Sequence, residues 1–395
     1  MKEKMTEGFK KVYGEADGVR VFFAPGRVNL IGEHTDYNGG HVFPCALTIG
    51  TYAAVRKRND RKLRFYSANF AEKGILEASL DDLIYRKETD WANYVCGVIS
   101  VFVKKGMLPD CGFDFYCYGT IPNGSGLSSS ASLEVLSAQV LKSLYGFDVD
   151  NITMALIGQE AENKYIGVNC GIMDQFAVAC GKKDSAIFLD TATLQYKYVP
   201  VRLEGIRIVI GNTCKKRGLG DSKYNERRAE CEKALAEIQN GNKEDIRVNG
   251  DVKALGDLSV ERFEKYAGSI SDDNCRRRAK HAVAENIRTL EAVEALENGD
   301  VERFGRLMID SHVSLRDDYE VTGKELDTMV EAALKCPGTI GARMTGAGFG
   351  GCTVSLVKEA DVDGFIARVG AEYEEKIGYK AEFYVVDIGE GPCEL

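Results

Sequence analysis

The sequence predicts a mixed α/β (α+β) fold that divides into two domains. A chain of 395 residues is long enough for two or three domains with a large core. Strand-like and helix-like periods alternate up to about residue 211, and the chain ends in a β-α-β unit that looks ferredoxin-like. We therefore expect one domain at 1–195 and a second at 196–395, with a helical insertion at about 220–335.

Composition and charge exclude several classes of protein. The formal net charge of −9 argues against nucleic-acid binding, which needs a concentrated basic face. No stretch approaches the ~20 apolar residues of a membrane span, and the N-terminus lacks the apolar core of a secretory signal. The twelve cysteines are scattered without a Cys-x-x-Cys pair and indicate reduced thiols. We expect a cytoplasmic protein that is a monomer or a weak homo-oligomer and contacts neither membrane nor nucleic acid.

The first part of the chain reads as one short helix, several strands and a buried helix. In order, we expect a charged helix at 2–16, a strand at 19–24, a strand pair within 43–55, a hairpin turn in the basic run 56–62, a strand at 63–66 and a buried helix at 91–102. Trp91, the one tryptophan of the sequence, opens that last helix. Its default role is core packing, and the alternative is stacking on a base.

A glycine- and serine-rich run at 122–134 stands between a predicted strand at 113–118 and a helix that ends near Gly146. Gly124 and Gly126 permit backbone conformations that other residues resist, and the free N–H groups at a helix start attract anions. Four hydroxyl groups follow, at Ser128, Ser129, Ser130 and Ser132. The run therefore predicts a phosphate cradle, and the alternative is a serine-capped helix after a glycine turn.

Other nucleotide-binding motifs are absent from the sequence or incomplete. There is no Gly-x-x-x-x-Gly-Lys-Ser/Thr loop, and no His-Arg-Asp or Asp-Phe-Gly of a protein kinase. Gly124 and Gly126 begin like a dinucleotide fingerprint, but Ser129 occupies the third position, where close helix–strand packing favours glycine. A nicotinamide-dependent oxidoreductase is thus the weaker alternative.

A polar, glycine-broken segment at 24–40 is the second candidate for a binding site. Glu33, His34 and Asp36 lie within four positions and offer several acceptors and one imidazole to a polyhydroxylated ligand. Arg27 has no acidic neighbour within five residues, so its guanidinium is available to a phosphate. The alternative is a surface loop whose charges are only solvated.

The second half of the chain supplies one isolated acid and another glycine loop. Asp174 lies in the otherwise apolar run 168–181, where an acid is either a helix cap or a functional carboxylate. Helical patterns follow at 224–238, 258–267, 274–297, 300–316 and 322–335. Strands are expected at 338–344, 352–357 and 381–387 and a helix at 361–377, with the glycine-rich loop 345–351 between the first two strands.

Five of these segments together resemble the galactokinase family of the GHMP small-molecule kinase superfamily. Residues 27–37 (RVNLIGEHTDY) are similar to its sugar-binding motif, 124–131 (GSGLSSSA) to its phosphate loop and 345–351 (TGAGFGG) to its third motif, and 170–176 and 222–228 also fit. One departure is Ser125, where many relatives carry a glycine. The resemblance implies a mixed-sheet N-terminal domain, a ferredoxin-like C-terminal domain and an active site in the cleft between them.

The resemblance also implies the reaction and a role for each matching residue. ATP would phosphorylate galactose at its anomeric hydroxyl, with Asp174 as the base and Arg27 stabilising the transferring phosphoryl group. The sugar would be contacted by Glu33, His34, Thr35, Asp36, Gly171 and Tyr224. The ATP phosphates would be wrapped by Gly124, Ser125, Gly126, Leu127, Ser128, Ser129 and Ser130, with Trp91 near the adenine. Mg²⁺ would be held by Ser130 and Glu162.

Three further alternatives remain open at this point. One is a related kinase for N-acetylgalactosamine, arabinose or a uronic acid, which only the volume of the pocket separates from the first. A second is a non-catalytic galactose sensor, a class marked by loss of the Ser-Ala pair that is present here as Ser130 and Ala131. The third, a helical interaction protein built on the charged region 220–335, explains none of the glycine loops.

Overall fold

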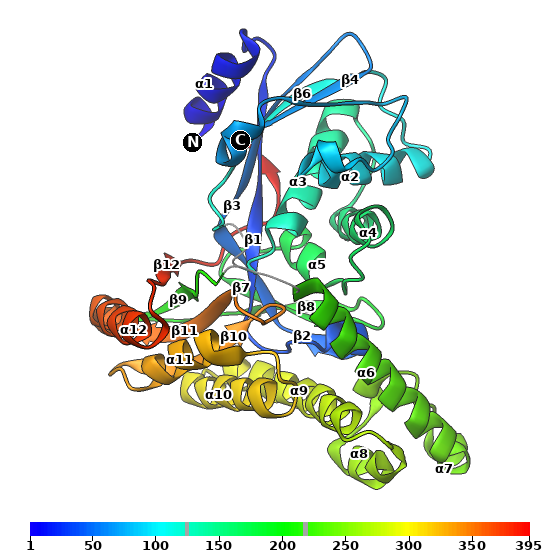
Figure 1. Cartoon of the computed structure of the whole chain (residues 1–395), viewed down its shortest axis with the longest axis vertical. Coiled ribbons are helices and arrows are strands. Elements are labelled where there is room, and N and C mark those ends of the chain that lie inside the picture. Colours follow the sequence, from blue (N-terminus) through cyan, green and yellow to red (C-terminus); the bar gives the residue numbers. More distant parts are fainter. Residues whose placement is uncertain (123–125, 216–219) are drawn as a thin grey trace.

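Three sheets and the helices that cover them build an elongated molecule in the described part of the chain (Figure 1). The computed structural model describes residues 1–122, 126–215 and 220–395, with the backbone alone at 220–222. None of the helices in these ranges is long and apolar enough to cross a membrane. The two-domain mixed α/β architecture expected from the sequence is confirmed.

The first sheet has six strands and is mixed. Its strand order is β13 (Cys393–Glu394), β1 (Arg20–Asn29), β3 (Pro44–Lys57), β6 (Phe113–Gly119), β4 (Lys62–Ser67) and β5 (Leu76–Ser79). All neighbours pair antiparallel except β4 and β6, which run parallel. The last residues of the chain therefore return to the first sheet, and both termini lie beside it (Figure 1).

Alternating side chains bury both faces of this sheet. Val21 and Ala54 pack against α1 (Lys2–Tyr13), whereas the neighbouring Phe22 and Ala53 face the main core on the other side. That core is covered by α2 (Ala92–Lys104), α3 (Ser129–Tyr145), α4 (Asn151–Ala161) and α5 (Met173–Ala179). The alternation of period two thus places α1 against one face of this part of the sheet and the helical layer against the other.

The strand pair expected within 43–55 and the hairpin expected at 56–62 are wrong. Residues 44–57 form the single strand β3, whose apolar run is continuous because both of its faces are covered. Its partners are β1 and β6, so β3 does not pair with β4, which follows it in sequence. Gly50 lies mid-strand, where an added Cβ would meet the carbonyl oxygen of Ala24 at 2.1 Å.

The second sheet has the ferredoxin-like order that the sequence predicts. Its strands are β10 (Thr339–Thr345), β11 (Cys352–Lys358), β9 (Ile206–Asn212) and β12 (Glu382–Val386), in that order and all antiparallel. The helices α11 (Gly323–Leu334) and α12 (Val362–Ile377) pack against one face. A small third sheet joins β2 (His41–Val42), β7 (Ser185–Asp190) and β8 (Tyr196–Pro200).

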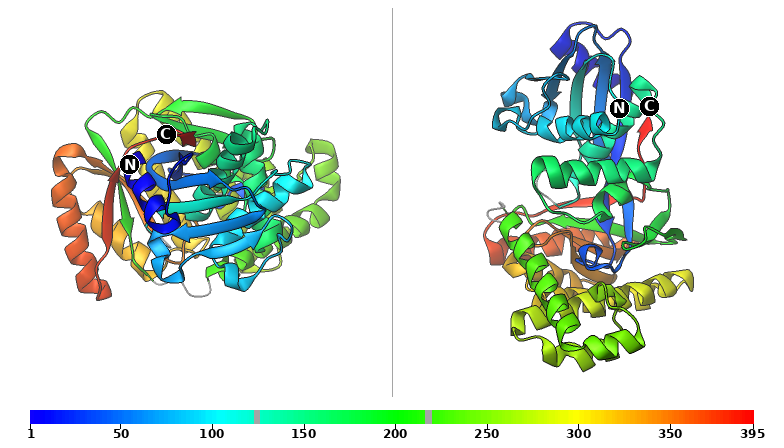
Figure 2. Two further views of the ribbon diagram at one scale, coloured as in Figure 1. Left: turned by 90° about the horizontal axis from the view of Figure 1, so that it is seen from above. Right: turned by 90° about the vertical axis from the view of Figure 1, so that its right-hand side faces the viewer.

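A group of helices is inserted between β9 and β10, close to the ranges expected from the sequence. Its members are α6 (Gly220–Gly241), α7 (Lys243–Asn249), α8 (Val260–Tyr266), α9 (Asp273–Glu297) and α10 (Val301–Asp317). Figure 2 shows these helices at the end of the molecule opposite the six-stranded sheet. One hydrophobic cluster joins Val28 and Phe43 of the first half to Ile210 and Val354 of the second, so both halves share a core at their junction.

Candidate active site

One cavity of about 880 Å³ collects most of the residues that the sequence singled out. Segments from both halves of the chain line it. The predicted site residues on its wall are Arg27, Glu33, His34, Asp36, Gly126, Ser128, Ser129, Ser130, Glu162, Gly171, Asp174 and Tyr224. The expected cleft between the halves is therefore present, with the three motif loops around it.

An ion pair between Arg27 and Asp174 lies on this wall. The Nε and Nη2 atoms of Arg27 each donate to one carboxylate oxygen of Asp174, both at 2.8 Å. Strand β1 supplies the arginine just after a register shift, and the first turn of α5 supplies the acid. The side chain of Arg27 is 3% exposed, whereas that of Asp174 is 31% exposed. A shielded cation thus holds a carboxylate that is open to the cavity.

Burial alone would lower the pKa of Arg27, but the nearby carboxylates more than offset it. Asp174 and then Glu33 are the main acids, and the net effect raises the pKa of Arg27. The guanidinium therefore stays charged at any accessible pH.

The glycine- and serine-rich run ends at the start of α3, where a helix has its free N–H groups and the positive end of its dipole. Ser129 and Ser130 form the first turn and line the cavity. Leu127 is fully buried in the shared core and does not line it. Gly124 and Ser125 lie outside the described residues.

Two glycine-rich loops meet beside the ion pair. The carbonyl oxygen of Gly126 accepts from Nη1 of Arg27 at 2.7 Å, and an added Cβ on Gly346 would come within 2.9 Å of the same oxygen. Ser128 adopts a left-handed conformation, with φ 60°, and its hydroxyl donates to Asp174. Glycine at 346 (φ 86°) therefore permits the close approach that joins the phosphate loop to the third motif.

A hydroxyl and a carboxylate with the chemistry of magnesium ligands lie next to this junction. Ser130 hydrogen-bonds Glu162, whose Oε2 also accepts from Gln175 Nε2 at 2.6 Å and Cys170 Sγ at 3.4 Å. Burial, and secondly Asp174, raise the pKa of Glu162 to about 7. A buried acid among other acids is a place where a cation is favoured. The described residues contain no cluster of three or more His, Cys, Asp or Glu side chains suited to a metal, but Mg²⁺ needs only one or two protein oxygens besides phosphate and water.

Sequence reasoning missed two buried residues, Gln175 and Glu134, that are linked to Glu162 by hydrogen bonds. Gln175 Nε2 also donates to Glu134 Oε2 at 3.0 Å, so one amide bridges two carboxyl groups. Glu134 is fully buried on α3, and burial raises its pKa well above the usual range. Its place in a helix that otherwise reads as core was the one available signal, since an acid at a buried helical position needs a partner.

Glu33 is held at the cavity wall by donors from β10 and from the third motif. Its Oε1 accepts from Gly346 N at 2.7 Å, Thr345 Oγ1 at 3.1 Å and Arg343 Nη1 at 3.4 Å. All three donors come from β10 and the loop after it. Glu33 is 1% exposed and lines the cavity, and its charge-assisted hydrogen bonds fix the orientation of the carboxylate.

Asp36, Gly171 and Tyr224 lie close together on the same wall. An added Cβ on Gly171 would clash with Asp36 Oδ2 at 1.8 Å, so only glycine leaves room for this carboxylate. Burial, and secondly Asp174 and Glu33, raise the pKa of Asp36 to about 7. The ring of Tyr224 lies 5.7 Å from that of His34. The arrangement presents several acids, an imidazole and a phenol to one small polar ligand.

Besides Leu127, two further predicted site residues, Thr35 and Trp91, do not line the cavity. The hydroxyl of Thr35 lies 2.9 Å from the carbonyl oxygen of Gly32 and 2.7 Å from that of His41, where it ties the segment together. Trp91 packs on the core of the first sheet, with its ring 6.3 Å from that of Phe65. A contact of Thr35 with sugar or of Trp91 with adenine stays a prediction.

Several lining residues were given no role in the sequence analysis, although Lys223 lies within the matching segment 222–228. Lys215 and Lys223 add two cations to the wall, and the segment 320–323 forms part of it. Lys215 Nζ pairs with Glu325 Oε2 at 2.9 Å, and Lys223 lies over the ring of Phe349. The lysines belong to a part of the chain where basic residues are frequent, so position alone did not distinguish them.

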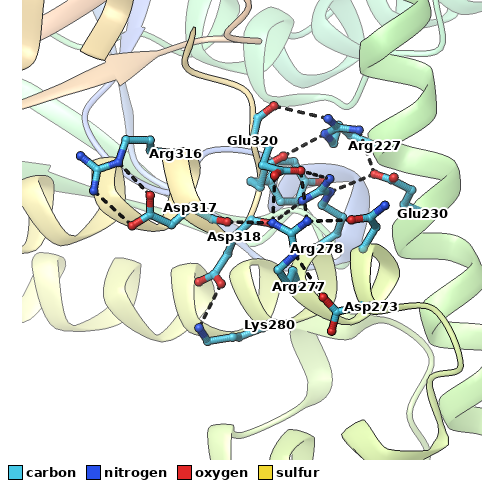
Figure 3. A network of polar contacts seen from close by, with 12 residues as sticks. Arg227, Glu230, Asp273, Arg277, Arg278, Lys280, Arg316, Asp317, Asp318 and Glu320 are labelled. Carbon is cyan, nitrogen blue, oxygen red and sulfur yellow. Dashed lines mark hydrogen bonds and ion pairs between the residues drawn. The ribbon is translucent and has the colours of Figure 1, made fainter. Parts of the chain in front are cut away.

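A network of charged residues supports that segment from behind (Figure 3). Arg278 of α9 is 2% exposed and donates to Glu230 of α6 at 3.0 Å, to the carbonyl of Asp318 at 2.6 Å and to Glu320 at 2.5 Å. Arg227 Nε donates to the carbonyl of Tyr319 at 2.8 Å. The network therefore ties α6, which carries Tyr224, to α9 and to the cavity segment.

Three family models match the chain along most of its length. The galactokinase galactose-binding signature matches residues 7–57, the GHMP kinases N terminal domain matches 93–182 and the GHMP kinases C terminal model matches 292–375. The first covers the segment with Arg27, Glu33, His34 and Asp36, and the second covers Asp174.

Curated relatives are similar over their whole length. A galactokinase of Clostridium beijerinckii is 58% identical over 391 residues, covering 99% of this chain and 98% of the relative, and a galactokinase of Bacillus subtilis is 53% identical over 395 residues, covering 100% and 99%. The crystal structure of Lactococcus lactis galactokinase complexed with galactose superposes with a TM-score of 0.95 at 48% identity, covering 100% of this chain and 99% of that one. A mevalonate kinase structure shares the fold, with a TM-score of 0.65 at 17% identity and coverage of 94% and 98%.

Proposed function

The chain belongs to the galactokinase family, and from that premise we propose that it transfers the γ-phosphoryl group of ATP to the anomeric hydroxyl of galactose, giving galactose 1-phosphate. The observation that carries the proposal is the Arg27–Asp174 ion pair at the junction of the phosphate loop and the sugar-motif segment. Phosphoryl transfer needs positioning and charge neutralisation more than covalent chemistry.

Asp174 is proposed to take the proton of the anomeric hydroxyl. A sugar hydroxyl is a poor nucleophile until its proton has somewhere to go, and Asp174 presents a carboxylate open to the cavity. Arg27 holds that carboxylate in place and offers positive charge to the transferring phosphoryl group. Glu33, His34, Asp36, Gly171 and Tyr224 would orient the sugar, a role supported by their shared place on the cavity wall.

Mg²⁺ is proposed to bind at Ser130 and Glu162 together with the phosphates of ATP. The raised pKa of Glu162, caused first by burial, favours a cation beside this carboxylate. The bound ion would supply charge neutralisation to the phosphates. Gly126, Ser128, Ser129 and the N–H groups at the start of α3 would hold the phosphates themselves.

The partners, the location and the oligomeric state of the enzyme are proposals as well. We propose that galactose and ATP are the partners, that the enzyme is cytoplasmic, and that it is a monomer or weak homo-oligomer. The acidic net charge of −9 argues against nucleic acid as a further partner.

The test is a screen of monosaccharides with ATP and Mg²⁺ that reads ADP release, followed by phosphorus NMR of the product. We expect galactose to give the fastest release, above N-acetylgalactosamine, arabinose and a uronic acid, with phosphate on C1. Phosphate on another carbon, or no galactose-dependent ADP, would overturn the proposal.

A further inference from the structure

The imidazole of His34 is attached on one side to a buried chain of polar groups. Its Nδ1 lies 2.8 Å from the hydroxyl of Tyr37, which lies 2.7 Å from the hydroxyl of Tyr319. The Tyr319 hydroxyl in turn lies 3.3 Å from the Sγ of Cys231 on α6. His34 is also one of the residues that line the cavity, and its buried Nε2 has no hydrogen-bond partner among the described residues.

Every group in this chain is neutral at ordinary pH. Burial lowers the pKa of His34 to about 3, with His281 and nearby arginines adding to the effect. Burial raises the pKa of Tyr37 and of Tyr319 well above the usual range, and raises that of Cys231 to about 12. Each member therefore carries one proton, and the direction in which the donors point decides which nitrogen of His34 is protonated.

The thiol at the end of the chain favours one direction. A phenol O–H is a strong donor, whereas a thiol is a weak one, so Tyr319 donates to the sulfur of Cys231. Tyr37 then donates to Tyr319, because the Tyr319 proton is already used. His34 must donate from Nδ1 to Tyr37, which leaves a lone pair on Nε2.

We propose that the chain Tyr37–Tyr319–Cys231 fixes His34 as its Nδ1–H tautomer, so that Nε2 accepts a hydrogen bond from a hydroxyl group of the sugar. Tyr37, Tyr319 and Cys231 are then positioning residues that make the cavity select a hydroxyl donor at one position of the substrate. The sugar contact rests on the proposed function, whereas the tautomer belongs to the free protein and does not.

The surroundings hold the chain in place. Arg227 binds the backbone of Tyr319, and the network of Figure 3 fixes the neighbouring Asp318 and Glu320. The ring of Tyr319 also lies 4.8 Å from the ring of His34. A residue held by backbone, ring and hydroxyl together keeps its O–H in line with both neighbours.

His281 gives an internal contrast to His34. Its Nε2 lies 3.2 Å from the carbonyl oxygen of Glu33, which can only accept, so Nε2 carries the proton. Its Nδ1 then accepts from the hydroxyl of Ser314 at 2.8 Å. Burial lowers the pKa of His281 to about 4, so this ring is neutral as well. Two neutral buried histidines of the same molecule should therefore show opposite tautomers.

The experiment is a long-range ¹H–¹⁵N correlation spectrum of the four histidine rings in the full-length protein without ligand. The His34 signals are assigned from their loss in His34→Gln. We expect a pyrrole-type shift for Nδ1 of His34 and a pyridine-type shift for its Nε2, and the reverse for His281. A pyridine-type Nδ1 at His34 would overturn the proposal whatever galactose does.

Variants of the terminal thiol test the direction of the chain. Without an acceptor beyond Tyr319, Cys231→Ala should reverse the donors and shift His34 toward the Nε2–H tautomer, because an unpaired buried O–H is costly. The galactose Kd should then rise about three- to ten-fold, with kcat changed less than about twofold. Cys231→Ser keeps an acceptor and should retain the wild-type tautomer and Kd.

Cys275→Ala is the matched control, since Cys275 is an equally buried thiol of the same cluster outside the chain. It should leave the His34 spectrum and the galactose Kd unchanged. If Cys231→Ala and Cys275→Ala behave alike, the chain does not set the tautomer. If the wild-type protein does not bind galactose at all, the proposed function fails while the spectrum still decides the tautomer.

Discussion

Two clusters of arginine and carboxylate groups in this molecule have the same components and opposite electrostatics. On the cavity wall, Arg27 is outnumbered by acids, and burial raises the pKa of Asp36 and of Glu162 to about 7. In the network of Figure 3, which meets the wall at Glu320, hydrogen bonds from Arg277 and Arg278 lower the pKa of that carboxyl group to about 2. In the network, the arginines and the carboxylates neutralise each other. In the cavity, the acids outnumber Arg27 and remain available to a ligand.

This difference separates a functional cluster from a structural one more clearly than the presence of an ion pair does. Arg27 and Arg278 are both almost fully buried, and both bind carboxylates directly. Acids with raised pKa values gain most from ligands that bring hydrogen-bond donors or cations, which a sugar and Mg²⁺ do. We expect changes in the cavity to alter activity first and changes in the network to alter stability first.

The largest effect is expected for Asp174→Asn. The amide keeps the shape of the side chain but cannot accept the hydroxyl proton, so kcat should fall by about 10²–10⁴. Galactose binding, measured by calorimetry without nucleotide, should stay near the wild-type value. Asp363→Asn, at an exposed position of α12, is the control and should change neither. A near-normal kcat with a raised KM for galactose would make Asp174 a binding residue instead.

Arg278→Met should lower the free energy of unfolding by about 3 kcal/mol, because Glu230 and Glu320 lose a buried partner and the carbonyl of Asp318 loses its donor. Unfolding in urea measures this change in the free energy of unfolding. Arg316→Met removes only an exposed pair with the adjacent Asp317 and should cost less than about 0.5 kcal/mol. Equal losses in the two variants would mean that the network carries no special stability.

The sequence predicted the motif segments and most of the helices, because both depend on local residue patterns. The expected helix at 274–297 is observed at 273–297, and Gly126 and Gly346 of the two glycine-rich loops line the cavity. Pairings between distant segments were not accessible in this way. The parallel contact of β4 with β6 and the return of β13 to β1 join residues whose local sequence carries no record of their partners.

The site residues likewise fall into those that local sequence identified and those that only tertiary contacts reveal. Arg27 and Asp174 were singled out by an isolated cation and an isolated acid, and the structure brings them together although 147 positions separate them. The sequence did not single out Arg278 or Gln175, because an arginine or a glutamine on a helix is ordinarily a solvated side chain. Only the tertiary packing reveals that each is buried between carboxyl groups.

Asp36→Asn should stabilise the protein at neutral to alkaline pH while it weakens galactose binding. Asp36 keeps its proton up to about pH 7 in the folded protein but loses it near its ordinary value of 3.8 when unfolded. The folded state thus binds the extra proton in this interval, and the stability that Asp36 contributes falls as pH rises. Between pH 4 and pH 8 the variant should gain about 1 kcal/mol or more over the wild type, the equivalent of one pKa unit. Thermal or urea unfolding at both pH values measures it, and a difference that is the same at both would contradict the raised pKa.

A smaller and more selective effect is expected for Ser130→Ala. Loss of one hydroxyl ligand should weaken binding of the magnesium–nucleotide complex, while galactose binding without nucleotide stays nearly unchanged. Calorimetry with each ligand separately distinguishes the two. Ser137→Ala, a buried hydroxyl further along the same helix that bonds only the carbonyl of Leu133 among the described contacts, is the control. If Ser130→Ala weakens both ligands equally, the loop has a structural role.

The Arg27–Asp174 ion pair carries the proposed mechanism, and a double-mutant cycle on kcat tests it most directly. The cycle compares wild type, Arg27→Ala, Asp174→Asn and the double variant with saturating galactose and magnesium–ATP. Residues that act as a unit give non-additive losses, so the double variant should lose much less than the product of the two single losses. If the two losses simply multiply, Arg27 and Asp174 act independently, and the ion pair at 2.8 Å is not the catalytic unit proposed here.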